Sequence, residues 1–200
     1  MPEDFDTSYS LLGRALDTGD QGAWNELMAK YESFVYYLLR KSKIREGDLD
    51  DVAQEVSLEL CKHLKTFDPN KGRFRTWFGV IIRTKIAHYF RKLVAQDKKI
   101  DNFRNEYTFF AESDDAKLDA HIEQEWKDYV TIEALKRVET SYTGKAVEVF
   151  RRGLDGESIQ ETAEALGISE NSVYSYRQRV KKSLRKEVRQ LVIDLEGKIE

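Results

Sequence analysis

The stretch that most constrains the fold is residues 151–186, RRGLDGESIQETAEALGISENSVYSYRQRVKKSLRK. Ser158 followed three residues later by Glu161 is a capping box, which predicts that a short helix begins here. Gly167 can adopt the left-handed conformation in which many helices end. Ser169 then provides a cap for a second helix. Two helices joined by a tight turn that contains glycine are the signature of a helix-turn-helix motif.

Side chains in this stretch also fit the packing that the motif requires. Ala163 is small enough to let the two helices cross closely. The second helix carries an inward stripe at helical spacing, which consists of Val173, Tyr176, Val180 and Leu184. A generic helical hairpin with the same pattern is the alternative interpretation.

Helical periodicity continues through the rest of the chain. Only two prolines occur in 200 residues and few runs alternate between apolar and polar residues, which argues against a β-sandwich or a barrel. Apolar stripes predict helices over 23–38 and 49–64, and the same spacing predicts that Cys61 is buried. A third helix is expected from about Thr76 to Lys92. Its predicted buried residues are Trp77, Ile81, Ile82, Ile86 and Phe90. The predicted fold class is therefore all-α.

Charge changes along the chain in three blocks. Residues 1–95 carry 15 basic and 14 acidic side chains, residues 96–128 carry 5 and 10, and residues 129–200 carry 13 and 12. The middle block is predicted to be an acidic linker, because its first part is polar and aperiodic, although a helical pattern resumes near Lys117. The chain is therefore expected to contain two small helical domains, an N-terminal bundle over 1–95 and a C-terminal four-helix domain over 129–200.

Shorter charged runs are more sharply segregated. Residues 46–59 contain six acids and no base, and residues 177–189 contain seven bases and one acid. Residues 71–92 contain seven bases, no acid and five aromatic residues. Solvated helix faces would account for any one run, but segregated charge is typical of chains with partners of opposite charge. Cations interleaved with aromatic rings are the pattern of single-stranded nucleic-acid binding.

The second helix of the motif has an outward face that suits DNA. In helix-turn-helix proteins the first part of this helix lies in the major groove, where amide and guanidinium groups can hydrogen-bond base edges. The residues expected to face the bases are Asn171, Ser172, Tyr174, Ser175, Gln178 and Arg179. Lys181 and Lys182 come later on the helix and are expected to contact phosphates.

Two parts of the chain together resemble bacterial RNA polymerase sigma factors. Residues 50–92, DDVAQEVSLELCKHLKTFDPNKGRFRTWFGVIIRTKIAHYFRK, resemble the second conserved region of that family, and residues 129–190 resemble the fourth. The sequence TGDQGAWNELMAKY, residues 18–31, resembles the opening helix. Since no third-region domain separates the two parts, the chain resembles the extracytoplasmic-function (ECF) group. The resemblance implies that 1–95 binds core polymerase and recognises and melts the −10 promoter element, while 129–200 binds the −35 element.

The resemblance also implies roles for individual residues. The implied core-polymerase-binding residues are Asp50, Asp51, Gln54 and Glu55. Those implied for −10 DNA are Asn70, Lys71, Arg73, Phe74, Arg75, Trp77, Arg83, Lys85 and His88. The outward residues of the second motif helix, from Asn171 to Lys182, become the −35 DNA contacts. For Trp77, a role as an anchor of the core is the alternative interpretation.

Several positions depart from the family pattern. Val80 and Thr84 stand where family members often carry an arginine and an asparagine after the tryptophan. In the second motif helix, Tyr174 and Tyr176 stand where basic residues are common, and Arg177 stands where an apolar residue is usual. Tyr176 is expected to have taken over the packing position.

Other functions are less consistent with the sequence. The chain shows no Gly-rich phosphate loop, catalytic triad order or metal-ligand cluster, so no enzymatic activity, cofactor or metal is expected. A helix-turn-helix transcriptional regulator that acts without polymerase is the alternative function. The expected partners are core RNA polymerase, promoter DNA (duplex at −35 and single-stranded at −10) and an anti-sigma factor. An acidic start without an apolar signal segment, and the absence of a long apolar run, predict a cytoplasmic protein without membrane insertion.

Overall fold

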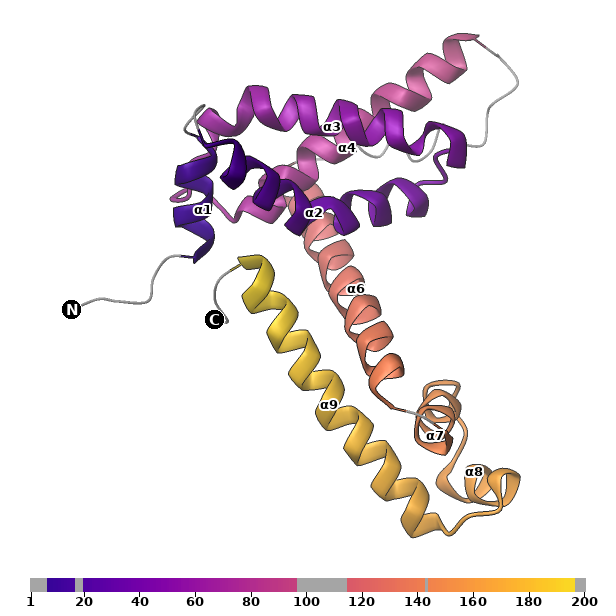
Figure 1. Cartoon of the computed structure of the whole chain (residues 1–200). Helices are drawn as coiled ribbons and strands as arrows, with labels where there is room; N and C mark the ends of the chain where they lie inside the picture. Colours follow the sequence, from indigo (N-terminus) through magenta and orange to yellow (C-terminus); the bar gives the residue numbers. More distant parts are fainter. Residues whose placement is uncertain (1–6, 17–19, 97–114, 143, 197–200) are drawn as a thin grey trace, which may run out of the picture. The chain divides into compact units, whose positions relative to one another are not determined.

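The computed structural model (Figure 1) describes residues 7–16, 20–96, 115–142 and 144–196. These residues form α-helices joined by turns, with two short 3-10 segments and no strand among them, which confirms the predicted all-α fold class. They fall into two compact parts, the N-terminal unit (residues 1–129) and the C-terminal unit (residues 130–200). No helix in the described ranges is long and apolar enough to span a bilayer.

The two units divide the helices between them. The elements of the N-terminal unit are α1 (Thr7–Ala15), α2 (Gln21–Lys41), η1 (Glu46–Asp48), α3 (Leu49–His63), η2 (Leu64–Thr66), α4 (Phe74–Gln96) and the first half of α6 (Asp115–Ser141). The C-terminal unit contains the rest of α6, followed by α7 (Lys145–Leu154), α8 (Ile159–Leu166) and α9 (Glu170–Glu196).

Helices α2 and α3 form where their apolar stripes predict. Asp20 caps α2 by accepting a 2.8 Å hydrogen bond from the backbone N–H of Ala23. Apolar residues at helical spacing form the buried face of α2, and Trp24 beside them is half-buried; the buried residues are Ala23, Leu27, Tyr31, Phe34, Val35, Leu38 and Leu39. The buried residues of α3 are Leu49, Val52, Val56 and Leu60. The prediction that Cys61 is buried is wrong, because this side chain is exposed. It directly follows Leu60, and one residue turns a helix by about 100°, which carries the thiol off the buried stripe.

Helix α4 is longer than predicted, and three of its five predicted buried residues, Ile82, Ile86 and Phe90, are buried. Its buried apolar positions include Phe74, Phe78, Ile82, Ile86 and Phe90. Trp77 and Ile81, which were predicted to be buried, are half-buried. The ring of Tyr31 on α2 meets Phe74 and Phe78 edge-on, with centroids 5.1 and 5.7 Å away. These aromatic contacts hold the start of α4 against α2.

The predicted linker differs from the structure in its last part. Residues 97–114 lie outside the described ranges, whereas residues 115–129 form the first half of α6 and belong to the N-terminal unit. Ile122 and Trp126 are buried there, and the Trp126 ring meets Phe34 of α2 edge-on at 5.0 Å. The acids of this segment were predicted to belong to a linker, but two of them are paired with arginines of α4.

The C-terminal unit contains the predicted helix-turn-helix. Both hydrogen bonds of the capping box form between Ser158 and Glu161 at the start of α8, and Gly167 ends this helix with φ 59° and ψ 45°. The side chain of Ser169 accepts a 3.1 Å hydrogen bond from the backbone N–H of Ser172 at the start of α9. The predicted caps are therefore confirmed.

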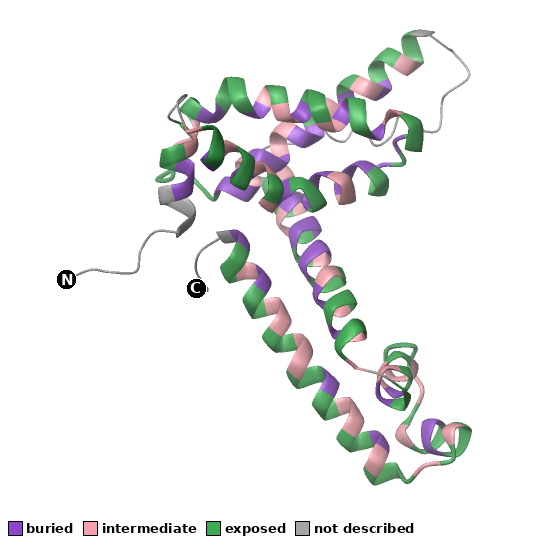
Figure 2. Cartoon of the chain, viewed as in Figure 1, coloured by how far each residue is buried: buried purple, intermediate pink, exposed green. Residues whose placement is uncertain are grey.

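Two apolar clusters hold the helices of this unit together. One contains Val138, Ala146 and Val180, and the other contains Val149, Ala163 and Val173. Tyr176 packs against both clusters, which confirms the packing role expected for it. Figure 2 shows buried positions recurring along α9 with exposed positions between them. The exposed positions leave much of this helix accessible to a partner.

Candidate nucleic-acid interface

The outward side of α3 carries a row of acidic and polar side chains. Its exposed residues include Asp50, Asp51, Gln54 and Glu55. Residues four apart lie on the same side of a helix, so the structure brings these four together. Leu58 extends the row and is 57% exposed. The hydroxyl of Tyr36 on α2 donates a 2.7 Å hydrogen bond to Asp50, which raises the pKa of the tyrosine.

The turn before α4 exposes three of the residues predicted to contact DNA, which are Asn70, Lys71 and Arg73. Asp68 organises this turn, because its carboxylate accepts hydrogen bonds from the backbone N–H (2.9 Å) and the side-chain amide (3.1 Å) of Asn70. The backbone carbonyl of Arg73 then accepts hydrogen bonds from the N–H groups of Thr76 and Trp77, which begins α4. Exposed cations therefore extend from an ordered turn.

Phe74 lies in the core rather than at the predicted position beside an exposed base, since it is only 7% exposed. Its ring packs against those of Phe67, Trp77 and Phe78 at centroid distances of 5.4, 5.7 and 5.6 Å. Such ring contacts stabilise the start of α4 beyond the burial of apolar area alone. Trp77 is half-buried in this cluster, a position that suits its alternative role as an anchor.

Arg75 is also buried, with 6% of its side chain exposed. Its Nε and Nη2 atoms donate hydrogen bonds of 3.2 and 2.9 Å to the carboxylate of Glu123 on α6. Thr76 donates a 2.7 Å hydrogen bond to the same carboxylate, and Arg73 Nη1 lies 3.9 Å from it. Burial alone would raise the pKa of Glu123, but the hydrogen bonds from Arg75 and Thr76 outweigh burial and lower that pKa.

Arg83 lies deeper still, and its side chain and that of its ion-pair partner Glu125 on α6 are each 2% exposed. Its Nε donates a 3.0 Å hydrogen bond to Glu125, and its Nη1 donates a 2.8 Å hydrogen bond to the hydroxyl of Ser42. Lys41 and His121 lie 3.8 and 3.4 Å from the same carboxylate. In this structure Arg75 and Arg83 are therefore buried and paired with Glu123 and Glu125 of α6.

The last two residues predicted to contact −10 DNA differ from each other. The ammonium of Lys85 lies 2.8 Å from Glu59 of α3, and 19% of its side chain is exposed. This contact is the main reason that the pKa of Glu59 is lowered. His88 is exposed, as a DNA contact requires. The hydroxyl of Thr84 donates a 2.8 Å hydrogen bond to the backbone carbonyl of Val80, so the side chain at this departure from the family pattern is bound to its own helix.

The predicted reading face of α9 is exposed with one exception. The exposed residues are Asn171, Tyr174, Ser175, Gln178, Arg179, Lys181 and Lys182. Ser172 is half-buried, and its hydroxyl lies 2.9 Å from the hydroxyl of Ser169 in the helix cap. Tyr174 is 56% exposed. Helix α9 therefore offers amide, hydroxyl, aromatic and cationic groups to a partner.

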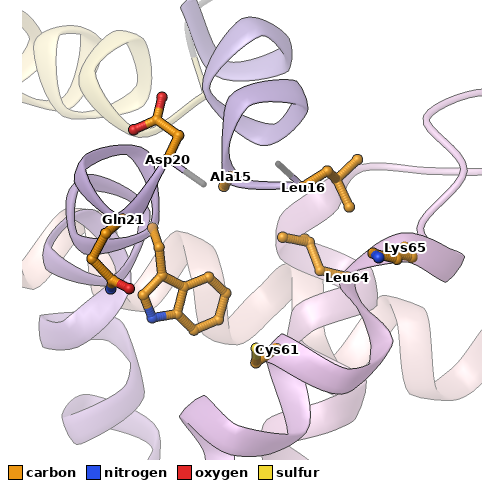
Figure 3. Close-up of a pocket in the computed structure, with 8 residues that line it drawn as sticks. Ala15, Leu16, Asp20, Gln21, Cys61, Leu64 and Lys65 are labelled. Atoms are coloured by element: carbon orange, nitrogen blue, oxygen red, sulfur yellow. The ribbon is translucent and has the colours of Figure 1, made fainter. Parts of the chain in front are cut away.

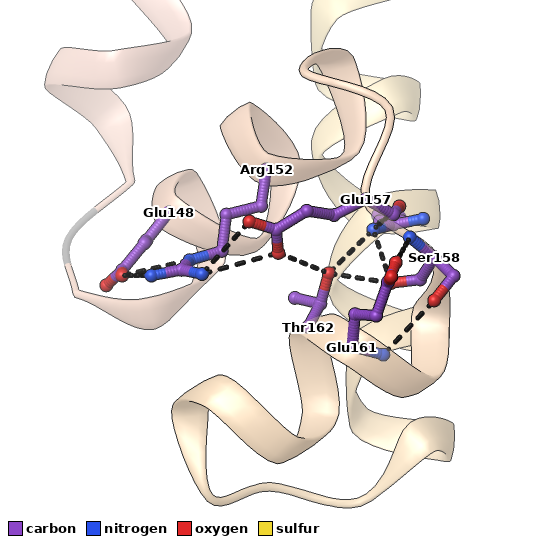
Figure 4. Close-up of polar contacts among 7 residues, drawn as sticks. Glu148, Arg152, Glu157, Ser158, Glu161 and Thr162 are labelled. Carbon is purple, nitrogen blue, oxygen red and sulfur yellow. Dashed lines mark hydrogen bonds and ion pairs between the residues drawn. The ribbon is translucent and has the colours of Figure 1, made fainter.

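Arg177 has a role that the sequence did not reveal. Its Nη2 donates hydrogen bonds of 2.9 and 3.0 Å to the carbonyl of Glu157 and the hydroxyl of Thr162. Glu157 is in turn paired with Arg152 at 3.1 Å (Figure 4). The guanidinium fills the space beside Gly153, where an added Cβ would lie 2.8 Å from its Nε. The arginine at this usually apolar position therefore ties α9 to the turn before α8.

A further feature that the sequence did not reveal is a pocket of about 210 Å³ in the N-terminal unit (Figure 3). Its lining residues are Ala15, Leu16, Asp20, Gln21, Trp24, Cys61, Leu64 and Lys65. They come from α1, the start of α2, the end of α3 and η2. None of the residues predicted to bind polymerase or DNA is among them.

Comparisons with known proteins match both units. The family model described as Sigma-70 region 2 matches residues 27–95, and that described as Sigma-70, region 4 matches residues 148–184. Together the two models cover more than half of the chain. The RNA polymerase sigma factor CnrH of Cupriavidus metallidurans is 31% identical over 90 residues, which are 45% of this chain and 45% of that relative. The chain thus matches less than half the length of this curated relative.

A solved structure, described as the structure of CnrH in complex with the cytosolic domain of CnrY, covers 88% of this chain and 94% of that chain. The sequence identity is 24% and the TM-score is 0.36. The two family models identify the chain as a member of the sigma-70 family of RNA polymerase sigma factors. Region 2 followed by region 4 is the composition of its ECF group, which confirms the resemblance found in the sequence. This is a family of transcription factors, not of enzymes.

Proposed function

We propose that this chain acts as an ECF sigma factor, which binds core RNA polymerase and directs it to specific promoters. The observation that carries the proposal is the order of the two family regions, each of which lies within its own unit of the fold. Each unit also exposes side chains of the kind that its proposed partner requires. The polymerase, and not this chain, forms the bonds of the transcript.

The acidic row on α3 is the proposed contact with core polymerase. Asp51 and Glu55 supply negative charge, which steers association with a basic surface. Leu58 adds an exposed apolar side chain that a partner can bury at the centre of such a contact. Because these side chains are exposed, replacing them should leave the fold intact.

For the −10 element, the proposed contacts are the exposed members of the nine residues that the sequence predicted to bind this DNA. These are Asn70, Lys71, Arg73 and His88, with Trp77 at the edge of the core. Lys71 and Arg73 can pair with backbone phosphates of a single strand. The part of the Trp77 ring that remains accessible can support an unpaired base, and such stacking contributes about 1–3 kcal/mol per base.

For the −35 element, we place α9 in the major groove of duplex DNA. Asn171, Gln178 and Arg179 can hydrogen-bond base edges, and each good two-bond pair gives about 1–3 kcal/mol of discrimination. Lys181 and Lys182 follow on the same helix and would bind phosphates, which fixes the helix in the groove without reading sequence. Binding to chromosomal promoters would require the chain to work in the cytoplasm.

Run-off transcription on fragmented genomic DNA tests the proposal. With purified core polymerase, new transcript starts that share −10 and −35 sequences are expected only when the protein is present. If no new starts appear and the protein does not co-elute with core polymerase, the alternative regulator that acts without polymerase is favoured.

A charge reversal on α3 tests the proposed polymerase contact. Asp51→Arg with Glu55→Arg should abolish co-elution with core polymerase while leaving the helical content unchanged. The matched control is Glu32→Arg with Asp155→Arg, which makes the same change in net charge at exposed positions elsewhere. Normal co-elution of the Asp51 and Glu55 variant would contradict the assigned interface.

An anti-sigma factor is a further proposed partner. A protein that covered α3 or α9 would keep the chain from polymerase or from DNA. Purification from source cells should then recover a second protein, and adding that protein should stop the run-off reaction. A co-purifying protein that leaves transcription unchanged would not be the proposed inhibitor.

A further inference from the structure

Three side chains at the start of α4 converge on one carboxylate. Arg75 donates to both oxygens of Glu123, Thr76 donates to Oε1, and Arg73 lies 3.9 Å from Oε2. Two guanidinium groups and a hydroxyl are also donors that a phosphate group prefers. The ring of Trp126 lies 5.5 Å from the Arg75 guanidinium carbon and holds this group in place independently of the carboxylate.

Exposure distinguishes this ion pair from the second one on α6. The side chain of Glu123 is 27% exposed, whereas those of Arg83 and Glu125 are each 2% exposed. The buried pair, with its additional hydrogen bond to Ser42, is closed to any ligand unless the unit opens. Glu123, in contrast, can turn into solvent while Glu125 and Trp126 keep α6 in place. The Arg83–Glu125 pair therefore anchors α6, whereas in the Arg75–Glu123 pair another anion can replace the carboxylate.

We propose that Arg73, Arg75 and Thr76 form a binding site for a backbone phosphate of single-stranded DNA, and that Glu123 fills this site as an internal competitor until the strand arrives. The inference rests on the proposed function, because it concerns the end of α4 assigned to the −10 strand. The exposed Asn70 and Lys71 precede the site in the same turn, so a strand bound to them passes close to it.

Exchange of one anion for another explains how the site can open at low cost. A phosphate that replaces the carboxylate leaves the Arg75 guanidinium paired, so no buried charge is left uncompensated. The released carboxylate returns to water. The arrangement also weakens binding of every strand, because any strand must displace Glu123 before it gains the Arg75 contact.

Fluorescence anisotropy with a fluorescein-labelled single-stranded oligonucleotide of mixed sequence tests the competition. Glu123→Gln keeps the shape of the side chain and removes its charge, so it should bind the oligonucleotide several-fold more tightly than the wild type. Asp119→Asn removes one charge from an exposed position of the same helix and controls for net charge.

A second measurement needs no variant. The side-chain carboxyl carbon of Glu123, observed by NMR in the full chain, should move toward the shift of a solvated glutamate when the oligonucleotide is added. An unmoved signal, or equal affinities for the Glu123→Gln and Asp119→Asn proteins, would overturn the inference alone. Failure of all three proteins to bind the oligonucleotide would overturn both the inference and the proposed strand-holding function.

Discussion

Arg83 is among the largest fully buried side chains of the described residues, and its charge is balanced by Glu125 from another helix. Moving a guanidinium and a carboxylate out of water costs several kcal/mol per ion. Their mutual attraction and the hydrogen bond to Ser42 offset that cost. Removal of Arg83 alone leaves the buried Glu125 carboxylate without its main partner, since Lys41 is a more distant cation at 3.8 Å.

Arg83→Met should therefore lower the free energy of unfolding by about 3–5 kcal/mol. The double change Arg83→Met with Glu125→Leu removes both charges and should recover most of the loss, because an apolar pair of similar volume needs no charge partner. Urea unfolding followed by circular dichroism measures both effects. A single variant as stable as the double variant would contradict burial of this pair.

His121 makes the stability of the same region depend on pH. Burial, followed by the charges of Arg83 and Lys41, lowers the pKa of its imidazole below the ordinary value of 6.5, and Asp128 partly offsets them. Glu125 lies 3.4 Å from its Nε2. In the unfolded chain the imidazole gains a proton near pH 6.5, whereas in the folded chain it does so only at lower pH. Below pH 6.5 the unfolded state therefore binds more protons, and stability falls as the pH falls.

In His121→Gln the side chain does not titrate, so the thermal midpoint of this variant should depend less on pH than that of the wild type. Between about pH 7.5 and pH 5.5 the thermal midpoint of the wild type should fall further than that of the variant. Above the ordinary histidine pKa the imidazole is neutral in both states, so the difference between the two midpoints should be constant there. A constant difference over the whole range would contradict the lowered pKa.

Arg73, Arg75 and Arg83 form one basic patch when only the sequence is considered. Their acidic partners lie more than 40 residues away along the chain, and no local rule connects the two. One signal was available, because Arg75, Gly79 and Arg83 are four residues apart and share a helix face. A glycine on a face between two cations is a place where another helix can approach closely.

At the scale of elements, Gly79 determines how closely α6 approaches α4. The glycine is buried, and a Cβ added to it would lie 2.5 Å from Cγ2 of Ile122 on α6. Ile122 is 0% exposed, and its branched side chain has little freedom to move aside. The contact lies between the two ion pairs that join these helices, so any displacement of α6 here weakens both.

Gly79→Ala should destabilise the N-terminal unit. Alanine favours helix over glycine by about 1 kcal/mol, but overpacking a well-packed core costs about 1–3 kcal/mol. In an Ile122→Ala background the same change should become neutral or stabilising, since space has been made for the new methyl group. Urea unfolding of the four proteins measures the coupling between the two positions.

Gly13→Ala in α1 is the matched control, because no described atom lies within 4 Å of the new Cβ. It should raise stability by about 0.5–1 kcal/mol through helix propensity alone. Equal effects of Gly13→Ala and Gly79→Ala would contradict the close approach of α6.

Elements with strong local signals were predictable from the sequence, and elements defined by distant partners were not. The capping box and Gly167 predicted α8, and Ser169 predicted the start of α9. The large buried apolar residues of α4 recur every four positions from Phe74 to Phe90, and the half-buried Trp77 and Ile81 lie beside this stripe. Ile82, Ile86 and Phe90 were therefore predicted correctly and Trp77 and Ile81 were not, and the arginines were assigned to solvent because their partners lie on α6.

At the scale of the whole chain, the N-terminal folding unit ends at residue 129, whereas the sequence predicted an end at residue 95. The acidic composition of residues 96–128 placed the boundary at residue 95. That placement was wrong because two of these acids, Glu123 and Glu125, are paired inside the unit. Trp126 and Tyr129 place their rings 5.0 and 5.2 Å from Phe34 of α2, which is 0% exposed. Residues 115–129 thus complete the aromatic core of this unit.

Fragments of the chain test that boundary. A fragment of residues 1–129 should unfold cooperatively in urea, with near-ultraviolet dichroism that reports its packed aromatic rings. A fragment of residues 1–95 lacks the partners of Arg75 and Arg83 and exposes Phe34, so it should lose that dichroism and unfold without a sharp transition. Adding Glu123→Gln and Glu125→Gln to the longer fragment should lower its urea midpoint part of the way toward that of the shorter fragment, because the rings remain while the ion pairs are lost.

If the shorter fragment unfolds as sharply and at the same midpoint as the longer one, residues 115–129 are not needed to complete the unit, and the boundary at residue 129 is contradicted.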